Sequence, residues 1–417
     1  MKKSRFAKIV LALVLALVLG ALIALPAFAE GPTYGGGTPA DPAKAPLTKR
    51  LQMPEGTVTP AATFNFTFEK VTLNNAPTPT PEQLATMPAI SMKSISFTSA
   101  DAGTVAAGVK TINKEFAVGT PAVNDVLNGV TFPNAGVYTY LVKEQQGGPY
   151  VPAANETMTY SPAEYQLVVY VANDPTSGPY VSAVSLIIIK DENGDPGDGE
   201  KVGGGGGGDG QWGALFINSY TRTTTTGPDI DDPDYYALAI SKKVTGTFGD
   251  QTLPFIFDVT MAPPAVASPL TTYVAHIVAA DGTRGPALNF VVGQPSMTQA
   301  ISLKHDETLM FVELPVGASY TAVERAVPDY TASAQIIVNG AAPVALSNAG
   351  PNAPLSSETR IIGADNNEAR FSNDYKDVPI TGLDISNLPF FVMLGVAVGL
   401  LAVMLITKSR RQEEVLY

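Results

Sequence analysis

The stretch GVYTYLVKE, residues 136–144, has large side chains at every second position, Tyr138, Tyr140 and Val142, and ends in an acid in the same phase. Alternation at every second residue is typical of a β-strand with one buried face, because neighbouring side chains of a strand point to opposite sides. Comparable short segments recur between Gly, Pro and Asn residues, as FNFTF at 64–68, YQLVVYV at 165–171 and FIFDV at 255–259. The sequence therefore predicts an all-β sandwich architecture.

Two shifts in composition divide this β-rich region. A linker rich in Gly and Pro occupies residues 30–45, and a run of Thr followed by acidic residues occupies 222–234. The two linkers leave predicted domains at 46–221 and 235–377, each long enough to bury a core of its own.

The N-terminus has the pattern of a secretory signal peptide. Four basic residues within the first eight precede an apolar stretch at 9–25, and Ala27-Phe28-Ala29 then stands before Glu30. A small-residue A-x-A site after such a stretch predicts removal of residues 1–29 by cleavage between Ala29 and Glu30. The alternative is a membrane helix that is retained, which the cleavage site disfavours.

The C-terminus combines three features in a fixed order. A pentapeptide at 378–382 and a spacer at 383–388 precede an apolar segment at 389–407, which is about long enough to cross a bilayer. The basic tail at 408–417 places that end in the cytoplasm and the bulk of the chain outside. Taken alone, the segment is consistent with a plain C-terminal membrane anchor.

The pentapeptide changes that interpretation, because the whole arrangement resembles the cell-wall sorting signal of Gram-positive surface proteins. The resemblance implies that a sortase cuts after the threonine and transfers its carboxyl group to an amine of peptidoglycan or of a neighbouring pilin subunit. It also implies a cell-surface protein attached covalently to the wall. The first residue departs from the commonest pattern, Leu, which leaves the sortase class open. The residues of the motif are Val378, Pro379, Ile380, Thr381 and Gly382.

Charge and cysteine content argue against nucleic-acid binding and exclude stabilisation by disulfides. The whole chain has a net charge of −12, and without residues 1–29 and 382–417 it keeps 19 basic and 35 acidic residues, a net charge of −16. A chain this acidic repels nucleic acid. There is no cysteine, so an exported protein must be stabilised by something other than disulfides.

The two predicted domains share an order of features. Each opens with a strand that carries a Lys, continues with a Phe-rich strand and a strand that ends in Glu, and closes on Phe-x-Asn-x-Tyr. The residues are Lys49, Glu144 and Asn218 in the first domain, and Lys242, Glu324 and Asn373 in the second.

Strand phase predicts that all six side chains are buried. Lys49 lies two residues from Leu47 and from Leu51, and the other five lie two residues from apolar or aromatic neighbours in the same way. Lys243 is a rival to Lys242 but has the opposite phase.

Burial of an amine, an acid and an amide together favours a reaction between them. Desolvation lowers the pKa of Lys and raises that of Glu, so the amine becomes neutral and the acid protonated. The neutral amine is then a nucleophile toward the Asn side-chain carbonyl. The acid polarises that carbonyl and carries a proton to the leaving ammonia. The expected product is an amide cross-link between the first and last strands of each domain.

The Leu-Thr-Lys opening, Tyr-x-Tyr-x-x-x-Glu strand and Phe-x-Asn-x-Tyr ending of the first domain resemble the streptococcal pilin isopeptide linkage domain. The second domain, with Ser-Lys-Lys-Val-Thr-Gly and the same ending, is similar to Cna B-type domains of Gram-positive pilins and adhesins. These resemblances imply immunoglobulin-like sandwiches with Lys and Asn on neighbouring terminal strands and Glu opposite. By position they imply Lys49–Asn218 and Lys242–Asn373 isopeptide bonds, with Glu144 and Glu324 as the catalytic acids.

The leading functional hypothesis is a pilus subunit or stalk that serves adhesion, and the alternative is a monomeric wall-anchored adhesin for a host protein or glycan. The Tyr-Pro-Lys acceptor motif of pilins is absent, so Lys190 and Lys201 are the candidate polymerisation lysines. No pattern indicates a cofactor, a metal site or catalysis on an external substrate. The acidic run 229–234 is interpreted as a solvated linker, with a calcium site between the domains as the alternative.

Overall fold

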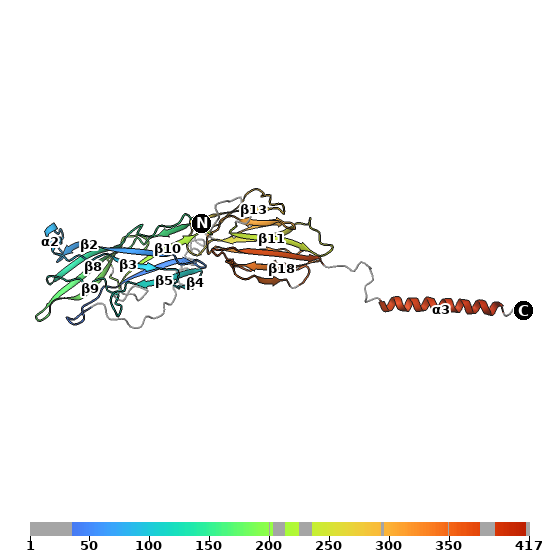
Figure 1. Cartoon of the computed structure of the whole chain (residues 1–417), viewed down its shortest axis with the longest axis horizontal. Helices are drawn as coiled ribbons and strands as arrows, with labels where there is room; N and C mark the ends of the chain where they lie inside the picture. Colours follow the sequence, from blue (N-terminus) through green and yellow to red (C-terminus); the bar gives the residue numbers. More distant parts are fainter. Residues whose placement is uncertain are drawn as a thin grey trace, which may run out of the picture.

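The computed structural model describes residues 36–199, 201–202, 213–224, 236–292, 296–348, 350–375 and 388–413. The predicted signal peptide, the sorting motif and most of the linker at 222–234 lie outside these residues. The described part consists mainly of β-strands, which confirms the all-β prediction, and the strands form two sandwiches that lie end to end (Figure 1).

The first sandwich contains ten strands and one short helix, α2 (Pro81–Thr86), in the connection between the second and third strands. The strands are β1 (Leu47–Pro54), β2 (Ala62–Leu73), β3 (Lys93–Phe97), β4 (Thr104–Ala106), β5 (Val109–Glu115), β6 (Gly136–Glu144), β7 (Glu156–Thr159), β8 (Glu164–Asp174), β9 (Gly178–Lys190) and β10 (Ala214–Arg222). One sheet has the order β4-β5-β1-β10-β7 and the other β3-β2-β6-β8-β9. The first and last strands of the domain, β1 and β10, are parallel neighbours.

The second sandwich repeats this plan. Its strands are β11 (Leu238–Thr245), β12 (Phe255–Ala262), β13 (Thr272–Val278), β14 (Leu288–Val291), β15 (Met297–Leu303), β16 (Thr308–Phe311), β17 (Ser319–Glu324), β18 (Tyr330–Ile337), β19 (Val344–Ser347), β20 (Leu355–Ser356), β21 (Arg360–Ile361) and β22 (Glu368–Tyr375). One sheet has the order β14-β13-β16-β11-β22-β18-β19; the other has the order β15-β12-β17-β20, with β21 also on β17. Again the first and last strands, β11 and β22, pair in parallel.

The cores follow the predicted strand phase. In β12, every second residue from Phe255 to Met261 is fully buried, and the residues between them are partly exposed. The two sandwiches have separate hydrophobic clusters, each lying between its own two sheets. Each domain therefore encloses its own apolar interior, in which a polar side chain is surrounded by hydrocarbon.

The end of β10 leads directly into a contact with the second domain. The Val316 N–H donates to the Arg222 carbonyl at 3.0 Å, and the Thr224 N–H donates to the Leu314 carbonyl at 2.8 Å. Gly317 has φ +85°, and a Cβ there would lie 2.2 Å from the Pro54 side chain. The described start of the predicted linker is thus hydrogen-bonded across the junction, and only glycine fits this close approach.

Helix α3 (Leu388–Glu413) is long and apolar enough to cross a membrane over Pro389–Lys408, where the mean hydropathy is 2.7. None of that segment is buried against the rest of the chain. Its length and composition fit the transmembrane anchor predicted at 389–407.

Candidate functional site

The predicted lysines and asparagines lie in the same register in both domains. In the β1–β10 ladder Lys49 pairs with Phe216 and Leu51 with Asn218, so Lys49 and Asn218 are two positions apart on one face. In the β11–β22 ladder Lys242 pairs with Phe371 and Val244 with Asn373, which is the same offset. Parallel pairing of the terminal strands thus directs both side chains of each pair into the core.

The glutamates come from the facing sheet. Glu144, the last residue of β6, pairs with Phe66 of β2, and Glu324, the last residue of β17, pairs with Phe257 of β12. Phe66 contacts Phe216 with ring centroids 5.0 Å apart, and the corresponding pair in the second domain, Phe257 and Phe371, has the same spacing. Each cluster is therefore enclosed by aromatic rings from both sheets.

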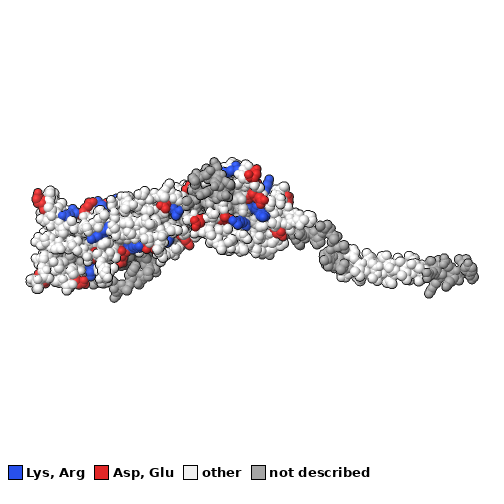
Figure 2. Space-filling view, in the orientation of Figure 1, with Lys and Arg blue, Asp and Glu red and all other residues white. Residues whose placement is uncertain are grey.

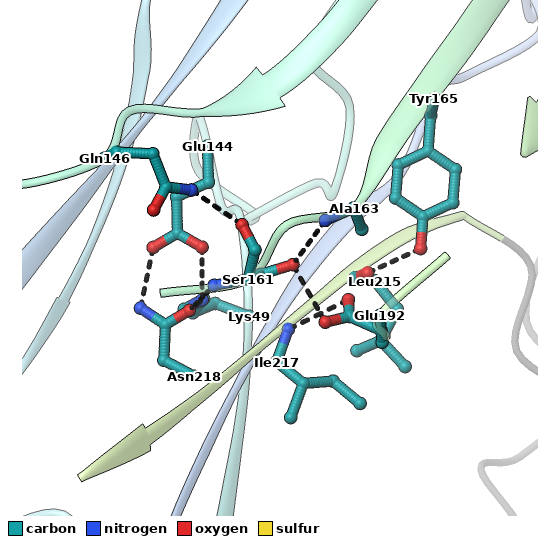
Figure 3. A network of polar contacts seen from close by, with 10 residues as sticks. All are labelled: Lys49, Glu144, Gln146, Ser161, Ala163, Tyr165, Glu192, Leu215, Ile217 and Asn218. Atoms are coloured by element: carbon teal, nitrogen blue, oxygen red, sulfur yellow. Dashed lines mark hydrogen bonds and ion pairs between the residues drawn. The ribbon is translucent and has the colours of Figure 1, made fainter. Parts of the chain in front are cut away.

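In the first domain the three side chains form a closed set of contacts (Figure 3). Lys49 Nζ lies 2.7 Å from Glu144 Oε2 and also hydrogen-bonds Asn218 Oδ1. Asn218 Nδ2 donates to Glu144 Oε1 at 2.7 Å. One carboxyl oxygen thus faces the amine and the other faces the amide nitrogen, which is the geometry needed to move a proton from one nitrogen to the other.

Burial adjusts both ionisable groups toward their neutral forms. None of the six predicted residues exposes more than 4% of its surface. Desolvation lowers the pKa of Lys49 and that of Lys242 to about 8. The same loss of water raises the pKa of Glu144 and that of Glu324. Burial therefore shifts both groups of each cluster toward the neutral amine and the protonated acid, which is the reactive combination.

The second cluster has the same members with fewer contacts. Lys242 Nζ lies 2.8 Å from Glu324 Oε1, and Asn373 Nδ2 donates to that same oxygen at 2.6 Å. Within the described part of the chain, Glu324 Oε2 and Asn373 Oδ1 are buried without a hydrogen-bond partner. The amine and the amide nitrogen still meet at one carboxyl group.

Each domain matches a known family model. Residues 45–196 match the model of the FctA family, described as the Spy0128-like isopeptide containing domain. The match covers most of the first domain and ends before β10. Residues 236–375 match a family described only as a domain of unknown function (DUF7601), so the likeness of the second domain to Cna B-type domains stays a prediction. No curated protein matches the chain.

Solved structures with a distant likeness include pilins and a pilus adhesin. The major pilin from Streptococcus pyogenes is 20% identical with a TM-score of 0.32, and the match covers 80% of this chain and 99% of that chain. The T-13 major pilin protein from the same species is 21% identical with a TM-score of 0.28, over 80% of this chain and 98% of that one. The pilus-presented adhesin Spy0125 (Cpa) is 13% identical with a TM-score of 0.25, and the match covers 80% of this chain and 99% of that chain.

Two residues that the sequence did not single out, Ser161 and Glu192, lie around the cluster of the first domain. The Ser161 N–H donates to Asn218 Oδ1 at 2.7 Å, and the Ser161 hydroxyl donates to Glu192 Oε2 at 2.8 Å. Both residues lie in connections between strands, where the two-residue period gives no signal. Glu192 belongs to the acidic stretch DENGD at 191–195.

The contacts of Glu144 bear on both steps that were expected of it. The sequence-based mechanism has this acid polarise the amide carbonyl and then carry a proton to the leaving ammonia. The carboxyl group contacts the amide nitrogen, which fits the second of these steps. A backbone N–H can only donate, so the atom of Asn218 that faces the Ser161 N–H must be the carbonyl oxygen. Glu144 is therefore placed to protonate the leaving nitrogen.

The remaining predicted residues lie away from the clusters. Lys190, at the end of β9, is half-buried. Lys201 is exposed and forms an isolated β-bridge with Ile187 of β9. Lys243 is exposed, as its strand phase predicts. The signal cleavage site, Ala29 and Glu30, and the sorting motif at 378–382 lie outside the described residues.

Proposed function

We propose that the chain is a subunit of a surface pilus whose two domains each close with an intramolecular Lys–Asn isopeptide bond. The observation that carries the proposal is the burial of the same three side chains in the same register twice. The match of residues 45–196 to the model of an isopeptide-containing family supports it. A buried Lys–Glu–Asn set is costly to keep as separate polar groups, whereas a neutral amide is not.

The proposed reaction is a condensation that balances without any co-reactant. Lys49 Nζ attacks Asn218 Cγ, the new C–N bond forms, and the Cγ–Nδ2 bond breaks. Glu144 takes the surplus proton from the amine through Oε2 and gives a proton to the leaving nitrogen through Oε1, so that ammonia departs and the acid is regenerated. The same exchange takes place in the second domain between Lys242 and Asn373, with Glu324 as the acid. There the amine and the amide nitrogen both contact Glu324 Oε1.

The position of the proposed bonds suits a protein under tension. Each would join the first strand of a domain to the last, so a pull on the chain ends passes from β1 through Lys49 and Asn218 into β10. The end of β10 is in turn hydrogen-bonded to the second domain, where Thr223 Oγ1 donates to Glu313 Oε1 at 2.6 Å. The other strands of each sandwich would then carry little of the pulling force.

The proposed location is the cell surface, with a sortase as partner. The apolar helix α3 supports membrane retention of the precursor, and the motif ending in Thr381 and Gly382 supports transfer to an amine. The visible face of both sandwiches is mostly uncharged, with acidic and basic residues scattered over it (Figure 2). This face has no basic patch for nucleic acid among its described residues.

Polymerisation is tested in wall extracts from a sortase-bearing host. We expect a ladder of high-mass species that withstands boiling in detergent, because neighbouring subunits are joined by amide bonds. Lys201→Ala should collapse the ladder if the exposed lysine accepts the Thr381 carboxyl, and Lys190→Ala tests the half-buried alternative. Lys143→Ala, a partly exposed lysine of β6, is the matched control. A single wall-linked band from the unaltered protein would contradict the pilus and favour the monomeric adhesin.

A further inference from the structure

The carbonyl of Asn218 already has a hydrogen-bond donor aimed at it. The Ser161 N–H lies 2.7 Å from Asn218 Oδ1, in a site where Ser161 is 1% exposed. Attack by an amine turns this oxygen into an oxyanion in the transition state. Donors held toward a developing negative charge in a water-excluded site lower the barrier, provided that they are held there in advance.

Ser161 is fixed in place by contacts on every polar atom (Figure 3). Its hydroxyl donates to Glu192 Oε2 at 2.8 Å and accepts from the Ala163 N–H at 3.2 Å. Its carbonyl accepts from Gln146 Nε2 at 2.8 Å. A residue with this many partners cannot easily turn its N–H away from Asn218.

Glu192 links Ser161 to the strand that carries Asn218. Its second oxygen, Oε1, accepts from the Ile217 N–H at 3.1 Å, and Ile217 directly precedes Asn218 in β10. One carboxyl group therefore bridges the donor segment and the reacting strand. Glu192 is partly buried, and the resulting loss of water raises the pKa of its carboxyl group to about 7.

The second domain has no equivalent of this arrangement among its described residues. Asn373 Oδ1 is buried without a hydrogen-bond partner there, although Lys242, Glu324 and Asn373 match the first cluster in register. Among the described residues the donor is thus found in the first domain and not in the second, which provides an internal reference.

We propose that the Ser161 backbone N–H is the oxyanion donor for the first-domain condensation and that Glu192 is a positioning residue that holds it toward Asn218. This rests on the proposed isopeptide function. The N–H takes no part in bond making and only stabilises the oxygen while Lys49 Nζ adds and ammonia leaves. A purely structural role for Ser161 and Glu192 would instead affect folding and leave the rate of condensation unchanged.

The test uses the full chain, isolated unfolded in urea and refolded into detergent micelles. Bond formation is followed in each domain by quenching samples and measuring, after proteolysis, the joined peptides that contain Lys49 with Asn218 and Lys242 with Asn373. Ser161→Ala and Glu192→Gln each loosen the hold on the donor. Since loss of an oxyanion donor slows reactions by about 10²–10³-fold, a misplaced donor should slow the first bond by at least about tenfold.

Controls separate positioning from folding. Ser161→Thr keeps the hydroxyl and should restore a rate close to that of the unaltered chain. The second-domain rate should not change in any variant. The same variants on a Glu144→Ala background, which is not expected to condense in the first domain, report the effect on stability alone.

An unchanged first-domain rate in both Ser161→Ala and Glu192→Gln would overturn the inference while leaving the isopeptide proposal intact. Equal slowing of both domains would overturn it too, because only general folding would then be affected. Absence of both joined peptides in the unaltered chain would instead refute the proposed function.

Discussion

Replacing Glu144 with Ala is expected to leave Lys49 and Asn218 unjoined and to destabilise the first domain strongly. The two residues are 169 positions apart, and the chain-entropy value for a covalent link that closes a loop of this size is about 5 kcal/mol. For a domain of this size that corresponds to a fall of about 10–20 °C in the unfolding temperature. The unreacted amine would also remain in an apolar core, which adds to the loss.

The readouts are the thermal unfolding of the first domain and the peptide map of its cross-link. Glu144→Gln tests the proton transfer more narrowly, because an amide of nearly the same shape cannot carry the proton between the two nitrogens. Glu69→Ala removes a largely exposed carboxylate of the neighbouring strand β2 and should change neither readout. Full cross-linking in Glu144→Ala would show that this acid is not needed.

Replacing Thr381 with Ala is expected to abolish covalent attachment to the wall. By its resemblance to a sorting signal, this threonine supplies the carboxyl group that the sortase transfers. Without transfer, the precursor keeps α3, whose 20-residue apolar segment holds it in the membrane. The protein should therefore move from the wall fraction to the detergent-soluble membrane fraction.

The fractionation has a matched control in Thr331→Ala, which removes an exposed threonine of β18. This variant should remain in the wall fraction. Wall-linked Thr381→Ala in normal amounts would show that attachment does not use this motif, and the plain membrane anchor would then be the better interpretation of the C-terminus.

Strand phase was enough to predict the fold class and to place the six predicted site residues in the two cores. The signal is strong because Lys49 lies between Leu47 and Leu51 on the apolar face of its strand, where a charged residue is unexpected. The pairing partners were harder to infer from the residues alone, since phase tells which face a side chain occupies but not which strand lies beside it. The parallel contact of β1 with β10, and of β11 with β22, brings Lys and Asn together.

What the sequence did not predict lies in the connections. Ser161 stands between β7 and β8, and Glu192 lies beyond the end of β9, so neither belongs to a periodic segment. Their importance arises only when distant parts of the chain meet at Asn218. The orientation of that amide, and with it the contact of Glu144 with the leaving nitrogen, follows from the Ser161 N–H and could not be read from residue types.

The intact mass of a fragment spanning residues 30–381 tests the central claim most directly. Two completed condensations predict a mass lower than the sequence value by two molecules of ammonia, about 17 Da for each amide formed by amine attack. A fragment that is folded and yet has the full sequence mass would contradict the account, because both clusters would then be buried without reacting.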